Sequence, residues 1–117
     1  MKKLYLDDIR FPKTNGWDIV RSYKEFVAWI NLNGLPDEIS FDNDLGDVPK
    51  TKDGEVLDFN EYSDHKEYTG YDCAKWLCDY CLINNLPIPK WNVHSANTVG
   101  VEYIDGILTN YKNKLNV

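Results

Sequence analysis

Three short apolar runs, each followed at once by polar side chains, constrain the fold of this chain more than any other feature. The runs cover residues 4–6, 39–41 and 91–93. Segments with helical periodicity and capping signals separate them, so strands alternate with helices along the chain. This alternation predicts a three-layer α/β domain with a short, mainly parallel sheet of about four strands.

Local signals set the expected limits of the elements. We expect strands at residues 3–7, 18–21, 38–42 and 91–94. Ser22, Thr69 and Asn97 are good N-cap residues and predict the starts of three helices. Only about ten residues link the first two strands, which is short for a parallel crossover, so the helix expected there must be degenerate or lost.

The length of 117 residues predicts a single domain, residues 1–117. Residues 46–68 form a long, polar, acidic insertion in that domain. Loops of this length are uncommon unless they bind a ligand, close over a site or are disordered. We therefore expect a flap beside the site.

Composition limits the class of protein. Hydrophobic residues make up 43% and charged residues 27%, which is typical of a folded, soluble chain. No apolar run has the length of a membrane span and no signal peptide opens the chain, so we expect a cytoplasmic protein with no membrane partner. The cysteines at 73, 78 and 81 share one helical face. Buried free thiols explain them better than a zinc or redox site.

Charge is distributed unevenly. Residues 37–72 hold twelve acidic residues and three lysines, a local charge of -9, whereas the whole chain has a net charge of -6. An acidic middle segment argues against binding a long nucleic acid backbone. It leaves open a nucleotide, an RNA end or another small phosphorylated ligand bound through a metal.

The polar ends of two strands indicate a metal site. Asp7 and Asp8 follow the first apolar run, and Asp42 and Asp44 follow the second. Ligand sites of parallel sheets lie beyond the carboxyl ends of the strands, where these carboxylates would repel one another without a cation. Hard oxygen ligands favour Mg²⁺, or Mn²⁺. The alternative is that these aspartates only form turns.

The third strand end adds an imidazole and a hydroxyl, His94 and Ser95. His94 suits a general acid, because it adjoins Ser95 at the carboxyl edge; the alternative is an ordinary packed histidine. Ser95 and Asn97 could cap the last helix, and the same helix start offers free N–H groups to a phosphate. Arg10, two residues beyond the acidic pair, suits a phosphate clamp; the alternative is a surface arginine or an ion-pair partner of an aspartate.

Four strings are informative as a set: LYLDDIR at 4–10, ISFDNDLG at 39–46, TGYDCAKWL at 69–77 and VHSAN at 93–97. Together they resemble the cyclic-phosphate processing receiver domain family, an offshoot of response-regulator receivers found in bacteria and phages. The resemblance spans residues 4 to about 111. It implies a receiver-like, flavodoxin-like fold with strand order 2-1-3-4 and no fifth strand.

The resemblance also implies roles. Asp7 and Asp8 match the acidic pair that holds Mg²⁺ in receivers. Asp42 stands where receivers carry the phosphoacceptor aspartate, and Asp44 adds a second carboxylate. Ser95 matches the residue that contacts the phosphoryl group.

Two further positions separate the chain from signalling receivers. His94 and Asn97 belong to a motif of this family that ordinary receivers lack. The fifth strand of ordinary receivers, with its lysine, has no counterpart in the chain. The missing lysine weakens a role in phosphorelay.

The function hypothesis is therefore metal-dependent processing, by hydrolysis or transfer, of a cyclic phosphate on a nucleotide or RNA end. This hypothesis favours a magnesium-dependent phosphoesterase. The catalytic residues would be Asp42, His94 and Ser95, and the phosphate-binding residues Arg10, Ser95 and Asn97. Two alternatives stay open: a receiver phosphorylated on Asp42, and a non-catalytic binder of a phosphorylated ligand or protein. The sequence leaves the exact substrate and the oligomeric state open.

Overall fold

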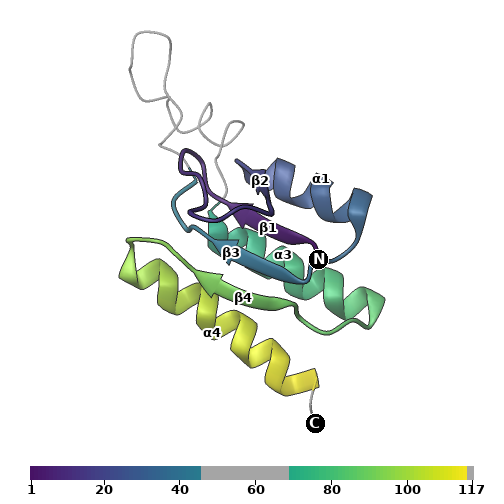
Figure 1. Cartoon of the computed structure of the whole chain (residues 1–117). Coiled ribbons are helices and arrows are strands. Elements are labelled where there is room, and N and C mark those ends of the chain that lie inside the picture. Colours follow the sequence, from purple (N-terminus) through teal and green to yellow (C-terminus); the bar gives the residue numbers. More distant parts are fainter. Residues whose placement is uncertain (46–68, 116–117) are drawn as a thin grey trace, which may run out of the picture.

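The computed structural model describes residues 1–45 and 69–115 and contains one parallel sheet (Figure 1). Its strands are β1 (Lys3–Leu6), β2 (Trp17–Val20), β3 (Glu38–Phe41) and β4 (Lys90–Val93). They lie in the order β2-β1-β3-β4, and all three neighbouring pairs are parallel. The helices are α1 (Tyr23–Asn33), α3 (Gly70–Asn84) and α4 (Thr98–Leu115). The predicted receiver-like α/β fold with order 2-1-3-4 is confirmed.

The capping signals work as predicted. Ser22 Oγ accepts a hydrogen bond from the Glu25 backbone N–H at 3.1 Å and starts α1. Thr69 and Asp72 form a reciprocal capping box at the start of α3. Gly34 ends α1 with φ 81°, a left-handed value that other residues rarely adopt. Local sequence therefore determines where the helices begin and end.

The three helices described by the structure lie on one face of the sheet. Their apolar side chains pack on Leu4, Leu6, Ile39 and Phe41, all of which are fully buried. The crossovers from β2 to β3 and from β3 to β4 advance in the same direction across the sheet, so right-handed connections place α1 and α3 on the same side. Helix α4 follows the last strand and joins them by packing against α3. Of the two helical layers expected, the described residues supply one.

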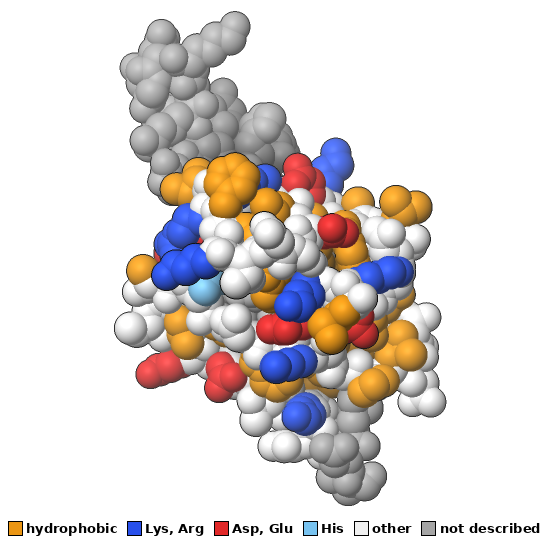
Figure 2. All heavy atoms as spheres, in the orientation of Figure 1, with side chains coloured by type: hydrophobic (Ala, Val, Ile, Leu, Met, Phe, Trp, Pro, Cys, Tyr) orange, Lys and Arg blue, Asp and Glu red, His pale blue; other side chains and the backbone are white. Residues whose placement is uncertain are grey.

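The link between β1 and β2 is the connection that runs the opposite way across the sheet. A helix there would cover the second face by the same handedness rule. Residues 7–16 contain no helix, which confirms that the first helix of the pattern is degenerate. The second face carries charged residues such as Lys3, Glu38 and Lys90, and in the space-filling view charged side chains are spread over the surface (Figure 2).

Three further expectations concern the cysteines, membrane-spanning helices and residues 46–68. Cys73, Cys78 and Cys81 are buried and free, as predicted, and burial raises the pKa of Cys78 and of Cys81 to about 11. The thiols therefore stay protonated and pack as small apolar side chains. Within residues 1–45 and 69–115, no helix has the length and apolar character needed to span a membrane. The flap expected at residues 46–68 lies outside the described residues.

Candidate functional site

Three carboxylates converge beyond the carboxyl ends of β1 and β3. One oxygen each of Asp7, Asp8 and Asp42 lies within 4.8 Å of the others. Asp7 is 0% exposed and Asp42 is 3% exposed. Backbone hydrogen bonds continue the sheet to this edge: the Asp7 N–H donates to the Val20 carbonyl and the Asp42 N–H donates to the Leu6 carbonyl. The strand ends thus place two buried acids side by side, as the sequence predicted.

The three acids have different electrostatic surroundings. Burial and the adjacent Asp7 charge raise the pKa of Asp42, against the lowering effects of His94, Arg10 and a hydrogen bond with Ser95. Burial, with the Asp7 charge adding to it, also raises the pKa of Asp8. Repulsion of this kind is what a bound cation would relieve.

Asp7 is the best-satisfied member of the group. Its Oδ1 accepts hydrogen bonds from the backbone N–H groups of Ile9 (3.0 Å) and Arg10 (2.8 Å). Its Oδ2 lies 2.9 Å from His94 Nε2 and 3.6 Å from Arg10 Nε. Although burial acts to raise it, these hydrogen bonds hold the pKa of Asp7 below its ordinary value. Asp7 therefore stays ionised and holds the loop after β1.

His94 has a protein partner at each ring nitrogen. Besides the contact of Nε2 with Asp7, its Nδ1 lies 2.7 Å from Ser40 Oγ. The ring also stacks on Tyr5, with centroids 4.4 Å apart and planes 5° apart. A neutral imidazole with its proton on Nε2 can donate to Asp7 and accept from Ser40. The residue predicted as a general acid is thus held by side chains from two strands, Tyr5 and Ser40, and by Asp7 just beyond β1.

The structure separates Asp44 from the other predicted ligands. Asp44 is exposed and does not belong to the group of three carboxylates. Its Oδ1 lies 3.5 Å from Asn97 Nδ2. Asn97 Oδ1 accepts from the Gly100 N–H at 3.1 Å, which confirms its capping geometry, and the Asn97 N–H donates to Ser95 Oγ. Ser95 therefore lies between the start of α4 and Asp42.

Two arginines border the site. The Arg10 side chain is 48% exposed, and its Nη1 donates to the His94 carbonyl at 3.4 Å. Arg21 Nη1 donates to the carbonyls of Asp7 (3.1 Å) and Arg10 (2.6 Å). No sequence motif marks Arg21, because its hydrogen-bond partners are backbone carbonyls.

Sequence reasoning also missed the residues that support His94. Ser40 is 1% exposed, and Tyr5 is 9% exposed beneath the imidazole ring. A hydroxyl between two apolar neighbours in a predicted buried strand was the available signal, since a buried polar group needs a partner. Nothing in the sequence pointed to Tyr5, which reads as one more aromatic strand residue.

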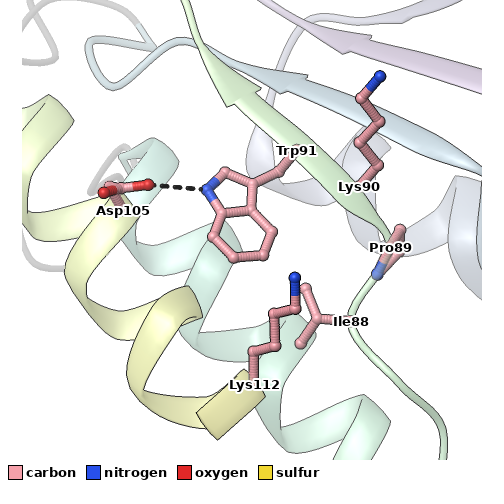
Figure 3. Close-up of a pocket in the computed structure, with 6 residues that line it drawn as sticks. All are labelled: Ile88, Pro89, Lys90, Trp91, Asp105 and Lys112. Carbon is pink, nitrogen blue, oxygen red and sulfur yellow. Dashed lines mark hydrogen bonds between the residues drawn. The ribbon is translucent and has the colours of Figure 1, made fainter.

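An open depression of about 440 Å³ lies away from this edge (Figure 3). It is lined by Ile88, Pro89, Lys90, Trp91, Asp105 and Lys112. Trp91 Nε1 donates to Asp105 at 3.1 Å, and Lys112 Nζ lies 5.8 Å from the Trp91 ring centre. The group of three converging carboxylates among the described residues lies elsewhere, so we place the candidate site at the carboxylate edge.

Replacing Asp42 with asparagine should stabilise the metal-free protein at pH 7. The folded-state pKa of Asp42 is raised, so its ionisation above that pKa costs stability, and asparagine cannot ionise. We expect a gain of about 1 kcal/mol, a rise in Tm of roughly 4–6 °C. Melting with a chelator checks this, and the gain should shrink at acid pH, where Asp42 is protonated. Asp79→Asn on the exposed face of α3 is the control. A fall in Tm would show that the Asp42 charge has a structural partner.

Comparison with known proteins gives one match. The family model described as the cyclic-phosphate processing receiver domain matches residues 2–110. Comparisons with curated proteins and with solved structures found no significant match. The match covers β1 through most of α4 and includes every residue of the candidate site.

Proposed function

Since this chain belongs to the cyclic-phosphate processing receiver domain family, we propose that it opens a cyclic phosphate on a nucleotide or RNA end. The observation that carries the proposal is the convergence of Asp7, Asp8 and Asp42 within 4.8 Å at the carboxyl edge of the sheet. Ser95 and Arg10 adjoin this cluster and offer donors to phosphoryl oxygens. An edge with both acids and such donors suits an anionic ester bound through a cation.

The donor set fits a hard divalent cation such as Mg²⁺ or Mn²⁺. Asp7, Asp8 and Asp42 would hold it through carboxylate oxygens, and burial and repulsion already raise the pKa values of Asp8 and Asp42. A cation bound there would polarise the phosphorus centre and lower the pKa of the attacking water. The sequence also suggested Asp44 as a ligand. Because Asp44 is exposed and lies outside the group of three carboxylates, we do not include it among the proposed ligands.

The proposed reaction is hydrolytic opening of the cyclic phosphate to a phosphate monoester. The oxygen of water forms a new bond to phosphorus, one P–O ester bond of the ring breaks, and a proton moves to the departing oxygen. Asp42 and Ser95 would border the phosphoryl group, and Arg10 would donate to its oxygens. The Asn97 amide nitrogen contacts only the exposed Asp44 among the described residues, at 3.5 Å, so it can turn to a phosphate oxygen.

His94, as an imidazolium whose Nδ1–H donates to Ser40 Oγ, is proposed to protonate the departing oxygen. The neutral imidazole left behind then takes up the proton that the attacking water releases. The Nε2 proton of His94 is directed at Asp7 Oδ2. The proton transfer therefore requires this hydrogen bond to lengthen, as it would if Asp7 Oδ2 bound the cation. Ser40 and Tyr5 would keep the imidazole at the edge meanwhile. His94 would otherwise act only by orienting Asp7, and His94→Gln separates the two roles. Glutamine preserves a donor to Asp7 but cannot transfer a proton, so kcat should fall while Mg²⁺ binding persists.

A product assay tests the proposal. Purified protein is incubated with 2′,3′- and 3′,5′-cyclic nucleotides, with Mg²⁺ or with a chelator, and the ring-opened monoester is separated by chromatography. We expect product with Mg²⁺ and none with the chelator, a large loss in Asp42→Asn, and no change in Asp79→Asn. Metal-dependent binding without product would support the non-catalytic binder. A stable mass gain on Asp42 with acetyl phosphate would support a signalling receiver.

A further inference from the structure

The loop that follows the acidic pair carries two large apolar side chains in solvent. Ile9 is 73% exposed and Phe11 is 72% exposed. Single exposed apolar residues are common on protein surfaces. These two differ in position, because Arg10 between them contacts Asp7 in the carboxylate cluster. An exposed aromatic ring therefore stands beside the proposed phosphate site.

The structure holds this loop in place. Asp7 Oδ1 accepts from the Ile9 and Arg10 N–H groups, and Arg21 Nη1 donates to the carbonyls of Asp7 and Arg10. The Arg21 guanidinium carbon also lies 4.6 Å from the centre of the Phe11 ring. The ring is thus supported by an arginine without losing most of its exposure. Pro12 further restricts the backbone of Phe11.

The charges around the ring suit a ligand that is aromatic and anionic. Arg10, Lys13 and Arg21 lie on or beside the loop, and Arg10 and Lys13 are exposed. Nucleobases stack on aromatic side chains of any kind, and neighbouring arginines add cation–π attraction and bind phosphate. A glycerol phosphate has no planar ring that could stack on an exposed phenyl ring.

We propose that Phe11 is a stacking platform for the base of a nucleoside phosphate whose phosphoryl group lies at the carboxylate edge. Arg21 is the positioning residue that holds the ring and the loop. This inference rests on the proposed function and assigns the residue that recognises the base of the substrate. The base can belong to a free nucleotide or to the last residue of an RNA chain, because both present the same ring.

The test compares two substrates in wild-type protein and variants. Adenosine 2′,3′-cyclic phosphate carries a base, and glycerol 1,2-cyclic phosphate does not. We expect Phe11→Ala to lower the preference for adenosine, as the ratio of kcat/KM values, by roughly 5- to 100-fold through KM. Phe11→Trp should retain the preference. The control is Ile83→Ala, which removes an 80% exposed apolar side chain on α3 and should leave the ratio unchanged.

Calorimetry with adenosine 3′-monophosphate and Mg²⁺ supplies a readout independent of turnover, and its Kd should weaken in Phe11→Ala by a similar factor. A short RNA with a terminal cyclic phosphate distinguishes the two sources of the base. A higher kcat/KM for this RNA than for the free cyclic nucleotide would identify the RNA end as the substrate, and equal values would identify the single nucleotide.

The two proposals fail in different ways. If wild-type protein opens both small substrates equally well, or if Phe11→Ala weakens both equally, base stacking is overturned while the proposed function stands. If wild-type protein neither opens nor binds any of these phosphates, both proposals fall.

Discussion

Replacing Gly70 with alanine should lower the free energy of unfolding by about 2–3 kcal/mol. A Cβ at this position would collide with the Asp42 carbonyl oxygen and would lie 2.9 Å from the Asp42 carbonyl carbon and 3.0 Å from Asn43 Cα. These are backbone atoms and cannot rotate away. The Gly70 N–H donates to the Asn43 carbonyl at 2.8 Å, so α3 cannot retreat without losing that bond.

The same chain provides a matched control. Gly106 lies within α4, and a Cβ there meets nothing within 4 Å. Gly106→Ala should therefore stabilise the protein by about 0.5–1 kcal/mol, the usual difference in helix propensity. Urea unfolding of both variants measures the two effects. An unchanged midpoint for Gly70→Ala would mean that the approach of α3 to β3 is looser than the structure shows.

Mg²⁺ should raise the free energy of unfolding of the wild-type protein by about 2.7 kcal/mol at a hundredfold excess over its Kd. The gain should vanish in the double variant Asp8→Asn with Asp42→Asn, because two of the three converging carboxylates are then neutral. Asp7 is left intact, since its oxygens accept backbone hydrogen bonds and contact His94. Melting with MgCl₂ and with a chelator makes the measurement.

A second double variant controls for net charge. Asp79→Asn with Glu102→Gln also removes two negative charges, but from exposed positions on helices. This variant should keep the full Mg²⁺ gain. If both double variants lose the Mg²⁺-dependent gain in stability equally, Mg²⁺ stabilises the protein through its net charge and not through the carboxylate cluster. If neither loses it, the cation binds elsewhere on the chain.

The sequence by itself determined the elements and the meeting of the acids. Apolar runs, caps and breakers are local signals, so each strand begins at the predicted residue or the one before it. Parallel strands end at one edge, and this alone predicts that Asp7 and Asp42 come together. The receiver-like order of the strands followed from four strings taken as a set, and the family model confirms the resemblance over residues 2–110.

Only the tertiary structure decided which of the candidate groups share the site. Spacing suggested that Asp44 accompanies Asp42, but the chain bends at Asn43, whose carbonyl accepts from Gly70 and whose side chain accepts from the Tyr71 N–H. That bend leaves Asp44 exposed on the rim.

The contacts that hold His94 likewise could not be predicted from the sequence, because its partners Ser40 and Asp7 lie 54 and 87 positions away in the chain. The same holds for the one helical layer that the described residues form, because the direction of the crossovers across the sheet, and no single residue, places α1 and α3 on one face. Local patterns specify elements and their ends, whereas side-chain partners and covered faces depend on how distant segments pack.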